Sequence, residues 1–352
     1  MIKKFNYFIF RFFYPKPIKI IKPSKREVSN LKIGDYSYKV YKINSCRLYT
    51  DTIHNMGIIQ NKKLLDGPSY QYKNLNFSNI RNNKILQIGT PRIVKNFKGT
   101  IFSLLTGGGG NENYYHWLFD VLPRLKLIEN IIDLKDINYF LLPALKKKFQ
   151  LTTLSMLKIP KKKLLSSQSN RHLSSDKIIA TSHPYRFNQN PVKDTSIPKW
   201  ISVWLKDKFL KKKNDRYSYD KIYIDRQYLN YNKLGRSILN NNEIKNFLKT
   251  QGFKSLLLEN YSFADQIGIF NKAKIIIGLH GAGFANIVFC RKGTKIVEIM
   301  SKTAGDEIRN LAKQNNLKYF SIVKKTEHKA NFQQGNIKIP LKELKKKLNT
   351  IF

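Results

Sequence analysis

The sequence predicts an α/β protein in which two Rossmann-like domains, each with a parallel sheet, face each other across a cleft. Three observations lead to this fold class. The 352 residues are enough for two domains of ordinary size. Hydrophobic residues make up 41% of the chain and aromatic residues 12%, which is sufficient for packed cores. Short apolar runs alternate with stretches of helical periodicity, as in parallel sheets whose strands are joined by helices.

The pattern divides the chain into five parts. Residues 1–83 contain short apolar runs broken by Pro, Gly and Asn, which predicts irregular strands and loops. Residues 84–190 are expected to form the first Rossmann-like domain. Residues 191–219 contain two prolines and a basic helix and are expected to be the linker. The second domain is expected at 220–325, and 326–352 should form a tail with a capping helix.

Individual elements follow from the period of the apolar residues. In the first domain, strands are expected at Ile85–Ile88, Thr100–Leu105, Ile137–Leu142 and Lys177–Ala180, and helices at Tyr114–Asn130 and Ala144–Leu157. In the second, strands are expected at Lys221–Asp225, Phe253–Leu258, Lys274–Gly278, Lys295–Met300 and Lys318–Ile322. Helices should connect them at Asn241–Thr250, Phe263–Asn271, Ala282–Phe289 and Asp306–Asn315, followed by Pro340–Leu348.

The formal net charge of +42 raises the alternative of a nucleic-acid-binding protein. A dedicated nucleic-acid binder usually concentrates its charge on one stripe or tail, whereas the lysines here are scattered through every segment. The sequence therefore predicts no specific nucleic-acid partner. It predicts only a general attraction to anions such as a nucleotide, an acidic glycan or an anionic lipid surface.

The cysteines and the N-terminal residues bear on the cellular location. Cys46 and Cys290 are far apart and suggest neither a disulfide framework nor a metal site, which fits a reducing cytoplasm. Met1–Phe13 is too short and too charged to span a bilayer, and no signal-peptide cleavage site follows it. Its basic and aromatic residues leave two alternatives open: peripheral contact with the inner face of a membrane, or packing on the protein's own surface.

A glycine-rich turn is the strongest local signal of a binding site. An apolar strand runs through Gly278-Leu-His280-Gly281-Ala282-Gly283 directly onto a helix. At such a place backbone N–H groups point towards the carboxyl end of the strand and can bind an anion, and His280 adds a donor. The alternative is a tight turn whose glycines serve geometry alone.

Three charged residues could complete this site. Glu298 ends the next strand, where a carboxylate could hold the two hydroxyls of a ribose, although a surface ion pair is the alternative. Arg226 and Arg236 flank the loop after the first strand of the second domain. The planar guanidinium of arginine matches two oxygens of a pyrophosphate at once.

A second constellation lies in the first domain, where Gly107–Gly110 precede a helix start. Asn113 is a good N-cap, and His116 and Asp120 are four residues apart, so they share one helical face. A histidine and a carboxylate in this arrangement could accept a proton. The alternative is a hydrogen bond that only stabilises the helix.

Together these stretches resemble glycosyltransferase family 61. The resemblance covers roughly Gly107 to Met300 and departs from the family at Ser237, where members often have a second basic residue. It is carried, in the family's order, by Asn113-Tyr-Tyr-His-Trp-Leu-Phe-Asp-Val-Leu-Pro-Arg124, Tyr223-Ile-Asp-Arg226, Arg236-Ser-Ile-Leu-Asn240, Ser262-Phe-Ala-Asp-Gln266, Gly278–Gly283 and Gly293-Thr-Lys-Ile-Val-Glu298.

The resemblance implies a GT-B-like architecture and an inverting, metal-independent transfer of a sugar from a nucleotide sugar, expected to be UDP-linked. The acceptor would be a hydroxyl of a glycan or lipid-linked glycan, in capsular or surface polysaccharide biosynthesis. No metal and no cofactor are expected beyond this co-substrate, and the chain contains no Asp-x-Asp pair. The alternative class is a non-catalytic carbohydrate-binding protein on the same fold.

The resemblance also implies residue roles. The departing diphosphate would be neutralised by protein groups. Asp120 would be the base that takes the acceptor's proton, with His116 orienting Asp120 or the acceptor, and Asn113 and Arg124 would position the acceptor. The donor would be bound by Arg226, Arg236, His280, Gly281, Ala282 and Gly283, with Glu298 at the ribose.

Overall fold

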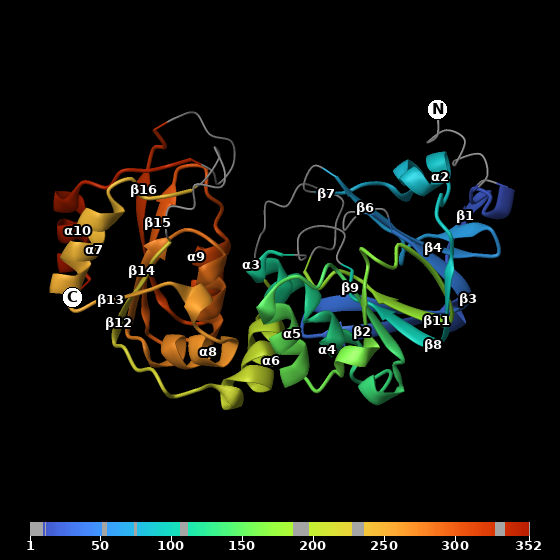
Figure 1. Cartoon of the computed structure of the whole chain (residues 1–352), viewed down its shortest axis with the longest axis horizontal. Coiled ribbons are helices and arrows are strands. Elements are labelled where there is room, and N and C mark those ends of the chain that lie inside the picture. The colour runs from blue at the N-terminus through green and yellow to red at the C-terminus, as the bar shows by residue number, and fades with distance from the viewer. Residues whose placement is uncertain are drawn as a thin grey trace. The chain divides into compact units, whose positions relative to one another are not determined.

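The computed structural model describes residues 10, 12–50, 55–73, 76–105, 112–185, 197–226, 236–327 and 335–351. The chain forms two compact units, Met1–Asp194 and Thr195–Phe352 (Figure 1). Both contain helices and parallel strands, so the α/β class is confirmed. The expected pair of Rossmann-like domains and the five-part division of the chain stay predictions.

In the second unit the described residues form a sheet of five parallel strands. Its order is β13 (Lys254–Leu256), β12 (Lys221–Ile224), β14 (Ile275–Leu279), β15 (Lys295–Ser301) and β16 (Lys318–Lys324). This is the 2-1-3-4-5 order of one group of doubly wound folds, in which ligands bind at the carboxyl ends of the strands. Every residue of β14 is buried, as expected of a strand covered on both faces.

Helices cover both faces of this sheet (Figure 1). On one face, α7 (Asn241–Thr250) and α10 (Leu341–Asn349) pack their apolar sides into a core with β14 and β15. On the other lie α8 (Phe263–Lys272) and α9 (Glu307–Gln314). The strands and helices expected in this unit are confirmed, except that Ala282–Phe289 forms a 3-10 helix, η8.

In the first unit the sheet is mixed, so the expectation of a wholly parallel sheet is wrong here. The strands β11 (His172–Thr181), β8 (Lys95–Ser103), β9 (Tyr139–Leu142) and β10 (Leu164–Ser166) are parallel, but β3 (Tyr36–Tyr49) pairs antiparallel with β11. The N-terminal residues extend the same sheet through strands that pair antiparallel with one another, apart from one parallel pair at its edge. They form β1 (Lys19–Ile21), β2 (Val28–Ile33), β4 (Asn55–Gln60), β5 (Lys63–Leu65), β6 (Tyr70–Lys73) and β7 (Asn76–Phe77).

Two expected elements of the first unit differ in type. Ile85–Ile88 is not a strand but part of the short helix α2 (Lys84–Ile88). The side chain of Asn83 accepts a hydrogen bond from the backbone N–H of Ile85 and caps this helix, and Gly89, with φ of 71°, ends it. Short apolar runs fit a strand or a buried helix equally well, so here the capping residues Asn83 and Gly89 identify the segment as a helix.

The helix expected at Tyr114–Asn130 is broken into three pieces. A single turn α3 (Tyr114–His116) leads into a π-helical turn (Trp117–Val121), and α4 (Arg124–Ile128) follows. The backbone N–H of Leu122 bonds to the carbonyl of Trp117, five residues back, and Pro123 has no N–H to continue the ladder. Such π-turns are frequent at functional sites. The next helix, α5 (Lys148–Met156), starts later than the sequence predicts.

Each unit holds one free cysteine, and both Cys46 and Cys290 are buried. Most of Met1–Phe13, for which membrane contact was left open, lies outside the described residues. Of those described, Phe12 and Phe13 are 82% and 67% exposed. No helix among the described residues is long and apolar enough to cross a bilayer.

Candidate active site

The first cluster begins at the helix start that Asn113 caps. The side chain of Asn113 accepts hydrogen bonds from the backbone N–H groups of Tyr115 and His116, at 2.9 and 3.3 Å. The π-helical turn that follows is anchored by Trp117, whose indole N–H donates to the hydroxyl of Thr153 on α5 at 2.9 Å. The preceding Gly107–Gly110 lie outside the described residues. The cap and the anchor together fix the backbone that carries His116 and Asp120.

Asp120 lies at the centre of this cluster and is only 1% exposed. Nδ1 of His116 contacts Oδ2 of Asp120 at 2.8 Å. The hydroxyl of Tyr185 donates a hydrogen bond to Oδ1 at 2.5 Å. Nε2 of His183 lies 3.8 Å from Oδ2. Both carboxylate oxygens are therefore engaged, whereas 27% of the His116 side chain is exposed.

The neighbours of Asp120 determine its charge. Burial raises the pKa of Asp120, but the adjacent imidazole of His116, followed by that of His183, outweighs burial and leaves this pKa below its ordinary value. Burial lowers the pKa of His183, and the attraction of Asp120 only partly offsets that effect. At neutral pH the cluster thus contains a carboxylate and a neutral His183.

Arg124 is buried beside this cluster and donates hydrogen bonds to its backbone. It is 2% exposed, and its Nε donates to the backbone carbonyl of Asp120 at 3.3 Å. Its Nη1 donates to the carbonyl and the hydroxyl of Thr181, both at 3.1 Å. Arg124 therefore ties the π-helical turn to the end of β11.

His183 and Tyr185 were not among the residues singled out from the sequence. They follow the end of β11, more than sixty residues beyond Asp120, and their rings pack edge to face with centroids 4.9 Å apart. The only signal available in the sequence is their place: they directly follow a buried strand of the same unit, where ligand-contacting side chains of α/β proteins gather.

The second cluster surrounds the glycine-rich turn after β14. A Cβ on Gly278 would lie 2.9 Å from Cβ of Ile224, and one on Gly283 would lie 3.0 Å from Cδ1 of Leu258. A Cβ on Gly281 would instead lie 2.9 Å from Nη1 of Arg226. Two of the three glycines therefore serve packing, and the third makes room for an arginine.

Arg226 and Arg236 converge on this turn. Nη1 of each lies 3.4 Å from the backbone carbonyl of His280. Burial, together with the positive charge of Arg226, lowers the pKa of Arg236 to about 10. Burial also lowers the pKa of Arg226. Two like charges brought together repel each other, and an anion bound between them would relieve this repulsion.

Glu298 is fully buried, at 0% exposed, in the middle of β15, so the expectation that it ends this strand is wrong. Its Oε1 lies 2.5 Å from Nδ1 of His280, and its Oε2 accepts a hydrogen bond from the hydroxyl of Tyr319 at 2.5 Å. Tyr319, on β16, was not predicted from the sequence. Both oxygens of Glu298 are therefore engaged, one by His280 of the glycine-rich turn and the other by Tyr319.

Among the described residues no group of three His, Cys, Asp or Glu side chains has the geometry of a metal site. The two clusters lie in different units, one within Met1–Asp194 and one within Thr195–Phe352. Each pairs a histidine with a buried carboxylate, and the second adds two arginines suited to a phosphorylated ligand.

Comparison with known proteins identifies the class that carries these clusters. The family model Glycosyltransferase 61 matches residues 114–297, just over half of the chain. The chain therefore belongs to glycosyltransferase family 61, and it is a glycosyltransferase that takes a sugar donor and a glycan acceptor. A search of curated proteins finds no match.

Proposed function

We propose that the protein is an inverting, metal-independent glycosyltransferase that uses a UDP-sugar and acts in capsular or surface polysaccharide biosynthesis at the cytoplasmic face of the membrane. The observation that carries this proposal is the convergence of Arg226 and Arg236 on the carbonyl of His280. This pair sits at the carboxyl end of parallel strands, where a leaving diphosphate would meet two guanidinium groups.

In the proposed donor site, the two arginines and the backbone of Gly281, Ala282 and Gly283 bind the diphosphate. Glu298 holds the ring of His280 through Nδ1, so that Nε2 is directed to the donor. This assigns to Glu298 a positioning role in place of the ribose contact implied by family resemblance. The 2-1-3-4-5 strand order of this unit supports the GT-B-like assignment.

In the first unit, the geometry favours His116 as the group that accepts the proton of the acceptor hydroxyl. Asp120 is buried with both oxygens engaged, whereas His116 is partly exposed. Asp120 then orients the ring and stabilises the imidazolium that forms, which is the division of labour in histidine–carboxylate pairs. Asn113 and Arg124 hold the backbone of this pair.

The reaction needs one base on the face opposite the leaving group. The acceptor oxygen forms a bond to the anomeric carbon while the bond to the diphosphate breaks, and the hydroxyl proton passes to His116. The anomeric configuration is inverted by this single displacement. The diphosphate leaves with the electron pair and is stabilised by the arginines.

Replacement of His116 by Ala and of Asp120 by Asn tests the assignment. A thermal-shift screen across sugar nucleotides first identifies the donor. Each variant should then lower kcat by about 10²- to 10⁴-fold without changing donor affinity, because a positioned base contributes that much. Asp207→Asn, an exposed carboxylate on α6 (Lys199–Phe209), is the matched control.

Transfer at the wild-type rate in either variant would remove that residue from the mechanism. Loss of activity on chelation, restored by Mn²⁺, would contradict metal independence.

A further inference from the structure

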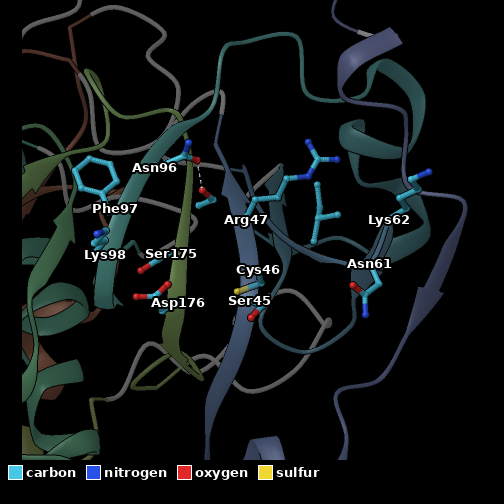
Figure 2. A pocket seen from close by; sticks show the side chains of 12 residues that line it. Ser45, Cys46, Arg47, Asn61, Lys62, Asn96, Phe97, Lys98, Ser175 and Asp176 are labelled. Atoms are coloured by element: carbon cyan, nitrogen blue, oxygen red, sulfur yellow. Dashed lines mark hydrogen bonds between the residues drawn. The ribbon is translucent and has the colours of Figure 1, made fainter.

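The first unit contains a cavity of about 560 Å³ that the proposed reaction does not use (Figure 2). It is lined by residues of β3, β8 and β11 and of the β4–β5 turn, all within Met1–Asp194. Ser174 on β11 precedes His183 by nine positions, which corresponds to roughly 30 Å along an extended chain. The cavity is therefore separate from the Asp120 cluster.

The floor of the cavity is a row of side chains on one face of the sheet. Asn96 pairs with Ser174, Ser174 with Arg47, and Arg47 with Ile59, across four neighbouring strands. Directly paired residues point to the same face, so three hydrogen-bonding side chains stand side by side. The hydroxyl of Ser174 donates to Oδ1 of Asn96 at 2.5 Å, which orients the amide.

The strands β3, β8 and β11 have irregular backbone geometry beside the cavity. The pairing of β8 with β11 shifts register between Ser175 and Lys177. Ser45 has a φ of 46° and Gly99 a φ of 89°, both in the left-handed region. Oδ2 of Asp176 accepts a hydrogen bond from the backbone N–H of Gly99 at 2.6 Å and fixes this bulge. Such bulges re-aim side chains and are common beside functional sites.

Arg47 is held rigidly at the centre of the row. Its Nη1 donates to the hydroxyl of Thr90 at 2.8 Å and lies 3.2 Å from Nε2 of His172. Its guanidinium also lies over the ring of Tyr14, 5.7 Å from the centroid. A side chain fixed in this way loses little entropy when a ligand binds.

We propose that this cavity binds a segment of a glycan, remote from the bond being formed. Its lining combines amide, hydroxyl, carboxylate and guanidinium groups (Figure 2), which suits a polyhydroxylated chain better than an apolar ligand. In a family 61 glycosyltransferase the glycan would be the acceptor, and this identification rests on the proposed function. The subsite would favour long acceptors over short ones.

The double variant Asn96→Ala/Ser174→Ala tests the subsite without changing any charge. Its matched control is Ser29→Ala/Asn30→Ala on β2, outside the cavity. Each protein is applied to a printed array of glycans at high ionic strength, which screens general attraction to a basic protein. The strongest binder is then titrated by calorimetry. The expected result is that the double variant weakens binding at least about tenfold, while the control binds like the wild type.

Three outcomes would overturn the inference: no glycan is bound by the wild type, the double variant and its control bind equally, or UDP displaces the bound glycan. If the double variant fails to fold, Asn61→Gly replaces it. That change removes an amide at the rim and is compatible with the φ of 47° at this position. Because binding is measured without transfer, loss of the subsite and failure of the His116 mechanism are seen separately.

Discussion

The hydroxyl of Tyr185 donates a hydrogen bond to Oδ1 of Asp120 at 2.5 Å, joining the end of β11 to the π-helical turn. His116 contacts the other oxygen of the same carboxylate. The carboxylate therefore cannot rotate without breaking one of these contacts. The orientation of the His116 ring is in this way linked to a residue 69 positions further along the chain.

Tyr185→Phe should lower kcat while leaving KM for the donor unchanged. The variant loses one hydrogen bond to a charged group, worth about 1.5 kcal/mol, or roughly tenfold in rate if that energy is used to hold His116. Steady-state kinetics measure the two constants, and Tyr217→Phe, a tyrosine of the other unit, is the control. A change confined to the melting temperature would show that Tyr185 only stabilises the fold.

Arg226→Ala should weaken the binding of UDP by about tenfold or more, because a charge-assisted contact with a phosphate is lost. Isothermal calorimetry measures the affinity directly and does not depend on the acceptor. Arg291→Ala, an exposed arginine of the same unit, removes the same charge elsewhere and should bind UDP like the wild type. Equal losses in both variants would indicate general electrostatic attraction in place of a specific site.

Adding a methyl group at two glycines of one turn should have two different effects. Gly281→Ala places a Cβ 2.9 Å from the flexible end of Arg226, so the arginine should shift and UDP affinity should fall with little change in stability. Gly278→Ala places a Cβ 2.9 Å from Cβ of Ile224 in the core and should destabilise the unit by about 1–3 kcal/mol. Denaturant unfolding and calorimetry separate the two. Identical behaviour of the variants would contradict the assigned roles.

The stability of the first unit should fall as the pH drops because of His172. Its Nδ1 donates to the carbonyl of Arg92 at 2.6 Å, and its Nε2 faces Arg47. Burial lowers the pKa of His172 to about 4, a shift that the hydrogen bond only partly offsets. The unfolded chain, with an ordinary pKa of about 6.5, takes up a proton that the native protein does not. The stabilisation is thus complete above the pKa of His172 in the unfolded chain, and it is lost as the pH falls towards the pKa of His172 in the folded protein.

Urea unfolding at about pH 7 and about pH 5 checks this prediction, because the histidine should contribute about 2 kcal/mol to the difference between the two conditions. In His172→Gln this part of the difference should vanish. The other ionisable groups, including His183, are common to both proteins and cancel in the comparison. An unchanged difference would contradict the assignment.

The sequence was sufficient to locate the strands and helices of the second unit, apart from the 3-10 type of η8. Short apolar runs such as Ile275–Leu279 alternate there with segments of helical periodicity. The four-residue spacing of His116 and Asp120 likewise places their side chains together, and they are in contact at 2.8 Å. Local spacing determines such contacts, so one sequence is enough to predict them.

What escaped prediction depends on pairing between distant residues. Tyr185 reaches Asp120 from the segment after β11, and Tyr319 reaches Glu298 from the neighbouring strand β16, so both contacts depend on the tertiary fold. The π-helical turn at Trp117–Val121 has no known sequence period, and its apolar residues fit a continuous helix equally well. The antiparallel pairing of β3 with β11 joins segments more than a hundred residues apart, which hydrophobic periodicity cannot reveal.

The two buried thiols give the molecule a built-in way to follow the opening of each unit. Cys46 lies in the core of the first unit, where burial raises its pKa to about 12, and burial also raises the pKa of Cys290 in the second. An alkylating reagent attacks the thiolate, so neither residue should be labelled while its unit stays closed. Mass spectrometry of the two alkylated tryptic peptides over time would then report the opening of each unit separately, with no residue substituted beforehand.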